Sequence, residues 1–191
     1  MKKLTPMVKR KKKCDIRIID NFLEEETFKK VQQMFEHPDT SWFYTPGVST
    51  PDETLNFTST NPLDNFMFAH VIYDRNEPRS NSYEEIGSMV VPAVQAHAGQ
   101  EFNVMTRMKA NMYVRTNEVN IHPWHVDSAE QPLLRGALLM LNTCDGYTGF
   151  IDGTTVDSVA NRMVFFDAHE KHHSTSTSNA SRRLTLNINY V

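Results

Sequence analysis

The 191-residue chain is predicted to fold as one α+β domain that is mainly β, with its strands in a sandwich or jelly roll. Two observations support this prediction. Both stretches with helical periodicity lie before residue 104, whereas the rest of the chain contains only alternating or short apolar stretches. Hydrophobic residues make up 39% of the chain and charged residues 23%, which is typical of a folded globular protein and excludes a disordered one.

The first half of the chain begins with a short strand and a helix. Residues 14–19 predict the strand. After Asn21 and Glu24, which resemble a capping pair, apolar residues recur at helical spacing. The helix is expected to end at residues 37–39, because His-Pro-Asp is a helix-terminating sequence.

A long loop follows, then a second strand and a second helix. Residues 40–65 have no period and are expected to form a loop that contains the aromatic cluster 42–44. Residues 66–73 predict a strand, and a helix is expected from Ser82 to about His97.

Strands alone are predicted for the second half. Residues 104–115 alternate, with Arg107, Lys109, Asn111 and Tyr113 on one face. Arg107 and Lys109 are expected either to contact an acidic substrate or, more commonly, to lie in solvent at a strand end. Further strands are expected at residues 122–127, 133–142, 150–151, 163–166 and 183–190. We therefore expect helical and loop support in residues 14–103 and the β core in residues 104–191.

Residues 1–13 form a basic tail ahead of an acidic body. They hold seven of the 20 Lys and Arg residues and no acid, so 13 basic residues face 23 acidic ones in the rest of the chain. A solvated extension is the simpler interpretation, and contact with nucleic acid or an acidic partner is the alternative. The tail is not followed by an apolar segment and the chain has no long apolar run, so we expect a cytoplasmic protein without a membrane span. Only two cysteines, Cys14 and Cys144, are present, so any metal is expected to have ligands other than thiolates.

Histidine is abundant, and five of the eight histidines lie between residues 122 and 173. His125 and Asp127 are two residues apart, so a strand would direct both side chains to the same face, where they could bind one metal ion. A distant histidine would complete a set of two histidines and one carboxylate. His173 and His172 are the candidates, because each stands ten residues before an arginine. Spacing alone does not choose between them.

The last predicted strand brings a cation and hydroxyl group onto one face. Period-two alternation groups Arg183 with Thr185, Asn187 and Asn189. A guanidinium with a hydroxyl two residues along is suited to bind a carboxylate.

These motifs resemble the signature of the iron(II)- and 2-oxoglutarate-dependent dioxygenases, especially the prolyl-hydroxylase-like branch and its small phage-type relatives. The resemblance rests on His125-x-Asp127, then His173, then Arg183-x-Thr185, and it covers residues 104–191 most strongly. The residues after Arg183 match the family pattern better than those after Arg182, which favours His173 over His172. The resemblance implies a double-stranded β-helix, cupin-like fold with flanking N-terminal helices.

The resemblance also implies roles and cofactors. His125, Asp127 and His173 would hold iron(II). Arg183, with Thr185 and Tyr113, would bind the far carboxylate of 2-oxoglutarate, and Asn111 would be a further cosubstrate contact. The enzyme would use dioxygen, with ascorbate in support, to hydroxylate a prolyl or other amino-acid or peptide substrate and convert 2-oxoglutarate to succinate. The alternatives are a nucleobase-oxidising dioxygenase and a non-catalytic cupin-like protein that binds a metal or ligand.

Overall fold

The computed structural model describes residues 13–49, 59–127, 131 and 133–191, and its strands form two antiparallel sheets. The α-helices and strands of the first half are β1 (Ile16–Ile19), α1 (Glu25–Glu36), β2 (Phe43–Thr45), β3 (Met67–Asp74), β4 (Glu77–Pro78) and α2 (Tyr83–Ala98). Those of the second half are β5 (Met105–Val114), β6 (Arg135–Met140), β7 (Tyr147–Phe150), β8 (Thr155–Asp157), β9 (Arg162–Asp167), β10 (His172–His173) and β11 (Arg182–Tyr190). Short 3-10 helices lie at Pro62–Asp64 and Gly99–Glu101.

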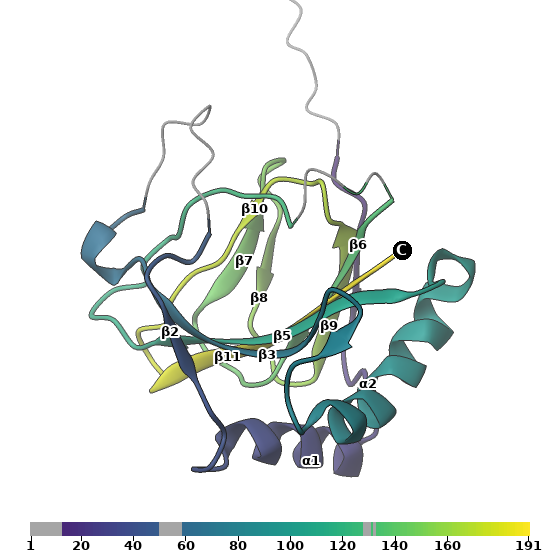
Figure 1. Ribbon diagram of the computed structural model, residues 1–191. Coiled ribbons are helices and arrows are strands. Elements are labelled where there is room, and N and C mark those ends of the chain that lie inside the picture. The colour runs from purple at the N-terminus through teal and green to yellow at the C-terminus, as the bar shows by residue number, and fades with distance from the viewer. Residues whose placement is uncertain (1–12, 50–58, 128–130, 132) are drawn as a thin grey trace, which may run out of the picture.

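The described part of the chain has a major sheet of eight strands and a minor sheet of three. The major sheet has the order β1-β9-β6-β11-β5-β3-β2, with β4 beside β3, and the minor sheet has the order β10-β7-β8. The minor sheet lies over one face of the major sheet, and both helices lie on the other side (Figure 1). This layered β arrangement, with strands from distant parts of the chain side by side, is that of a jelly roll.

Side chains alternate along the central strands between the apolar core on one face of the major sheet and a polar face on the other. On β11, Leu184, Leu186 and Ile188 are fully buried in the main apolar cluster, which also contains Val31 of α1 and Val90 of α2. Each such side chain contributes about 1.5–3 kcal/mol when it is fully buried. The opposite residues of β11 therefore face the minor sheet, which is where the polar side chains collect.

The start of α1 differs from the expectation. Glu24, not Asn21, is the N-cap residue and makes no side-chain capping bond, and Asn21 adopts a left-handed backbone conformation with φ of 51°. The side chain of Asn161 instead accepts a hydrogen bond from the Leu23 amide at 2.9 Å and donates one to its carbonyl at 2.8 Å. The backbone just before α1 is thus held by Asn161, a residue 138 positions away from Leu23. A local capping pattern could not predict this contact.

Several predicted segments also differ. Residues 122–127 are not a strand: they form an irregular extended segment with isolated bridges at Ile121 and His125, where Pro123 has no amide hydrogen to donate to a ladder. The predicted loop 40–65 contains β2, and its residues 50–58 lie outside the described part. Strands β1 to β4 join the major sheet, so this sheet is not confined to residues 104–191. No helix in the described ranges is long and apolar enough to cross a membrane.

Two carboxylate contacts hold segments near the sheets. The Cys14 thiol donates a hydrogen bond to Glu170 at 3.3 Å, and burial together with this acceptor raises the pKa of the thiol to about 11. Asp145 accepts hydrogen bonds from the Thr177 hydroxyl at 2.7 Å and the Ser178 amide at 2.9 Å. Burial alone would raise the pKa of Asp145, but the hydrogen bonds from Ser178 and Thr177 outweigh it and lower the pKa to about 2.

Candidate active site

Two histidines and one aspartate meet between the two sheets. One ligand atom each of His125, Asp127 and His172 lies within 4.8 Å of the others. Antiparallel backbone hydrogen bonds of 2.9 Å in both directions join His125 to His172 and place the imidazole centroids 4.4 Å apart. A set of two imidazoles and one carboxylate with free space beside it is the ligand set of mononuclear non-haem iron sites.

Backbone carbonyl groups orient both imidazoles. The Nδ1 atom of His125 lies 3.2 Å from the Pro123 carbonyl oxygen, and the Nδ1 atom of His172 lies 2.8 Å from that of Glu170. A carbonyl oxygen only accepts hydrogen bonds, so each Nδ1 carries a hydrogen and Nε2 is the ring atom left to bind a metal ion. This is the arrangement in which a histidine binds a metal ion with its ring already oriented. In the metal-free site, burial alone would lower the pKa of His172, but the hydrogen bond and charge of Asp127 raise it, so a metal ion would displace the proton from this Nε2.

The Asp127 carboxylate is held by two asparagines of β11. Its Oδ2 atom accepts hydrogen bonds from Asn189 at 2.7 Å and from Asn187 at 3.4 Å, and its Oδ1 atom lies 3.6 Å from His172 Nε2. Burial alone would raise the pKa of Asp127, but the hydrogen bond and charge of His172, with Asn189, hold the pKa well below its usual range. Burial, followed by the neighbouring His172, lowers the pKa of His125 to about 3. Asp127 is therefore ionised and His125 neutral, as metal binding requires.

The structure corrects the expectation that His173 joins His125 and Asp127: His172 does so instead. Both histidines belong to β10, which pairs with β7 so that adjacent side chains point to opposite sides of the strand. The His173 ring lies against Gly149, and its centroid is 4.4 Å from that of Trp124. A Cβ atom on Gly149 would come within 2.2 Å of His173 Nε2, so this glycine makes room for the ring.

Arg183 is a fully buried cation at the other end of the same cavity. Its guanidinium donates to Thr148 Oγ1 at 2.9 Å, Ser158 Oγ at 3.2 Å and the Thr175 carbonyl at 3.2 Å. All three partners are neutral, and the arginine is in no ion pair with another described residue, although burial lowers its pKa. Burying a charge without a counter-ion is costly, so this position is prepared for an anion. Arg182, the alternative in the sequence, lies outside the cavity and pairs with Glu36 at 3.0 Å.

The remaining predicted cosubstrate contacts line the same cavity. Tyr113 is opposite Arg183 in the β5–β11 register, and the Arg183 guanidinium carbon lies 5.5 Å from the centre of its ring. Asn111 is opposite Thr185 and donates to the Thr185 hydroxyl at 3.5 Å. The Oδ1 atoms of Asn111 and Asn187 are buried and have no hydrogen-bond partner among the residues that the structure describes. These unpaired acceptors indicate that the cavity binds a polar molecule.

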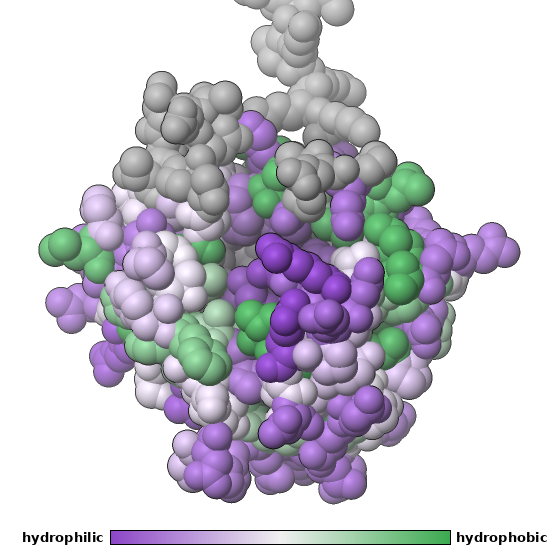
Figure 2. Space-filling view, in the orientation of Figure 1, coloured by the Kyte–Doolittle hydropathy of each residue, from purple (hydrophilic) through white to green (hydrophobic). Residues whose placement is uncertain are grey.

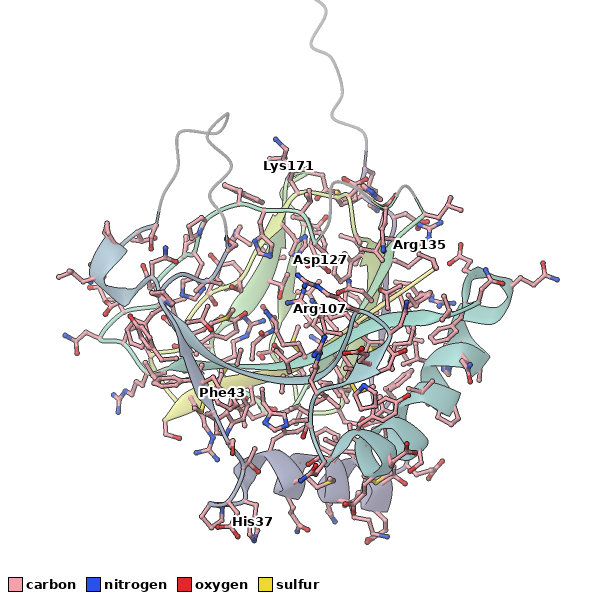
Figure 3. All side chains as sticks on the ribbon, in the orientation of Figure 1. His37, Phe43, Arg107, Asp127, Arg135 and Lys171 are labelled. Carbon is pink, nitrogen blue, oxygen red and sulfur yellow. The ribbon has the colours of Figure 1, made fainter. Side chains whose placement is uncertain are left out.

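The cavity has a volume of about 610 Å³ and also contains Arg107 and Lys109. Both side chains are only partly exposed, so the expectation that they lie in solvent at a strand end is wrong. Burial, followed by the charge of Arg107, lowers the pKa of Lys109 to about 7. Figure 3 shows Arg107 and Asp127 close together in the middle of the molecule, and Figure 2 shows a hollow in this face with strongly hydrophilic side chains along it.

The other histidines of the second half stand outside the ligand group. His122 stacks on Tyr113 with ring centroids 5.1 Å apart and bonds Ser174 Oγ at 2.9 Å. His169 pairs with Asp167 at 2.9 Å. The sequence did not predict the roles of Thr148 and Ser158, because no motif marks these partners of Arg183.

Comparisons with known proteins were made for the sequence and for the structure. No family model matches the chain, and no curated protein matches it. Many solved structures share its fold.

Three of the similar structures are an oxygenase-family oxidoreductase and two prolyl hydroxylases. A 2OG-Fe(II) oxygenase family oxidoreductase from Burkholderia pseudomallei is 11% identical with a TM-score of 0.64, covering 92% of this chain and 84% of its own. A prolyl-4-hydroxylase from Pseudomonas putida is 14% identical with a TM-score of 0.62, covering 93% and 92%. A prolyl hydroxylase from Trichoplax adhaerens, in complex with a peptide fragment of hypoxia inducible factor, is 14% identical with a TM-score of 0.59, covering 92% and 82%. The chain therefore has the fold of the 2-oxoglutarate-dependent oxygenases.

Proposed function

We propose that the chain is an iron(II)- and 2-oxoglutarate-dependent dioxygenase that hydroxylates a C–H bond of a prolyl or other amino-acid or peptide substrate. One observation carries the proposal. Two histidines and one aspartate share a cavity with a fully buried arginine that has no carboxylate partner among the described residues. A protein that only binds a metal ion needs the first group but not the second.

The residues present fit iron(II). His125, Asp127 and His172 would hold it through two imidazole nitrogens and one carboxylate oxygen, with Asn189 keeping the carboxylate oriented. When bound, iron supplies with dioxygen and 2-oxoglutarate the oxidising power for the reaction, which leaves succinate and carbon dioxide, and ascorbate keeps the metal reduced. The protein binds and orients these groups.

The residues present also fit 2-oxoglutarate. Arg183 would bind the carboxylate far from the metal, with the hydroxyl groups of Tyr113 and Thr185 beside it. The neutral partners Thr148 and Ser158 hold the guanidinium in place without neutralising it. The positive charge is therefore left for the cosubstrate.

The choice of substrate draws on the similar structures. Two of them are prolyl hydroxylases, and one of these holds a peptide. Another structure of this fold, with a TM-score of 0.61, is an α-ketoglutarate-dependent epimerase, so the fold supports more than one outcome. We retain the amino-acid or peptide substrate as the proposal. The nucleobase alternative depended on the tail 1–13, nearly all of which lies outside the described residues.

Succinate formation tests the proposal. The protein is incubated with iron(II), 2-oxoglutarate and ascorbate under air, and succinate is measured with and without candidate peptides, together with a one-oxygen mass gain in the peptide. Loss of succinate on omission of iron is expected. Full turnover without iron, or none with it, would refute the proposal.

The two adjacent histidines provide a sharper test. His172→Ala is expected to abolish high-affinity metal binding, whereas His173→Ala leaves a complete ligand set and retains it. His169→Ala is the matched control, because that imidazole pairs with Asp167 away from the group. Metal binding is measured by manganese(II) titration, and thermal unfolding verifies that each variant is folded. Equal metal affinity of the His172→Ala variant and the wild-type protein would contradict the assignment of His172 as a metal ligand.

A further inference from the structure

Two cations lie on the metal side of the cavity, far from the arginine assigned to the cosubstrate. In the β5–β11 register, Arg183 faces Tyr113 at one end, while Lys109 faces Asn187 and Arg107 faces Asn189 at the other. Asn187 and Asn189 are the residues that hold Asp127. At about 3.4 Å per residue, the Cα atoms of residues 107 and 113 are about 20 Å apart along the strand. Arg107 and Lys109 therefore belong to the end of the cavity where oxidation would occur.

Neither cation forms an ion pair in the described part of the chain, and Asp127, the acid whose charge acts on Lys109, belongs to the proposed metal site. Other lysines and arginines in that part do form ion pairs, among them Lys29, Arg75, Arg79, Arg135, Arg162 and Arg182. Arg107 and Lys109 are neighbours of like charge, half-buried in one cavity. Such a pair is unfavourable unless an anion binds to it.

Charge balance indicates that the anion is not the cosubstrate. A divalent metal ion and Arg183 carry three positive charges, and Asp127 and the two carboxylates of 2-oxoglutarate carry three negative ones. The loaded site is then neutral without Arg107 and Lys109. Their charge is left to attract a third molecule.

We propose that Arg107 and Lys109 bind a carboxylate of the substrate, so that the enzyme oxidises an amino acid or peptide that carries a carboxylate near the reacting carbon. This inference rests on the proposed function. An arginine fork and a lysine beside it provide several charged donors to one carboxylate. The carboxylate belongs either to the end of a free amino acid or to an acidic side chain of a peptide.

Matched probes that differ by one carboxylate test the inference and separate these two sources. L-Proline is compared with L-prolinamide, and acetyl-Asp-Pro-amide with acetyl-Asn-Pro-amide. Dissociation constants are measured by calorimetry on the protein loaded with manganese(II) and 2-oxoglutarate under argon. Succinate formation by the iron-loaded protein under air is measured in parallel.

In one of the two probe pairs, wild-type protein is expected to bind the carboxylate probe at least about tenfold more tightly than the matched amide. A charge-assisted hydrogen bond changes affinity by about tenfold to a hundredfold. Lys109→Met and Arg107→Gln are each expected to remove most of this preference and to leave the affinity for 2-oxoglutarate within about threefold. Arg115→Gln is the matched control: Arg115 is exposed, follows β5 directly and lies outside the cavity. It is expected to retain the preference.

Three results would overturn the inference. The wild-type protein shows no preference for either acid, or binds none of the four probes at millimolar concentration. Alternatively, the two variants bind 2-oxoglutarate more weakly by the same factor as they bind the probes. That result would indicate that Arg107 and Lys109 bind the cosubstrate. Absence of succinate in the wild-type protein would refute the proposed function as well, whereas succinate formation without preference would refute only the carboxylate assignment.

Discussion

The hydrogen bond from Asn189 to Asp127 provides a quantitative test of the proposed metal site. The donor nitrogen lies 2.7 Å from Asp127 Oδ2, and Asn189 is 2% exposed. A buried hydrogen bond to an ionised group is worth about 1.5–3 kcal/mol. If this bond orients the Asp127 carboxylate for metal binding, Asn189→Ala should weaken metal binding by about tenfold to a hundredfold.

Asn187 offers a control from the same strand and the same face. Its amide nitrogen lies 3.4 Å from the same carboxylate oxygen, near the limit of a hydrogen bond, and its own Oδ1 has no hydrogen-bond partner in the described part of the chain. Asn187→Ala is therefore expected to change metal affinity by no more than about threefold, because it removes a weak bond and an unpaired buried acceptor together.

Titration with manganese(II), with and without 2-oxoglutarate, measures both affinities, and thermal unfolding of the metal-free proteins reports any general loss of structure. A larger loss for Asn187→Ala than for Asn189→Ala would refute the argument. Equal losses that follow the change in unfolding temperature would refute it too, since they would indicate structural damage rather than ligand orientation.

Three further outcomes follow from the contacts described above. Thr148→Val removes the 2.9 Å partner of Arg183, and we expect 2-oxoglutarate to bind about fivefold to a hundredfold more weakly in calorimetry; unchanged affinity would exclude a role for this hydroxyl. Asp145→Asn should lower the free energy of unfolding at pH 7 by at most about 1 kcal/mol, because the carboxylate is exposed. Since the pKa of Asp145 is lowered to about 2, its contribution is present above the ordinary pKa and lost as the pH falls toward 2, so urea unfolding should show the two proteins converging in acid. With the pKa of Cys14 raised to about 11, iodoacetamide at pH 8 should modify Cys144 first, and faster labelling of Cys14 in mass spectrometry would contradict its burial.

Residues in regular strands were well predicted from the sequence. Alternation in residues 104–115 and 183–190 grouped Tyr113, Asn111, Arg183 and Thr185 correctly, and all four line one cavity. A period of two is a property of the backbone itself, so it does not depend on what the strand packs against.

Residues outside regular strands were predicted less well. His125 and Asp127 lie on an irregular segment held by isolated bridges, and they meet through folding rather than through strand alternation. A strand end in solvent was the commoner expectation for Arg107 and Lys109, because no local pattern indicates that this end of β5 lines a cavity together with Asp127. The partners of Arg183 on the minor sheet carry no motif either.

His172 and His173 show where residue counting stops being informative. The sequence limits the second histidine of the proposed metal site to this pair, and it places Arg183, an arginine suited to bind a carboxylate, on the cavity face of the last strand. It does not decide which ring faces His125. The segment between β10 and β11 is irregular, so the period-two alternation that orients Arg183 does not continue back to the histidines. The pairing of β10 with β7 makes that choice: it directs His172 inward and lays His173 over Gly149, a contact between residues that only the assembled sheets bring together.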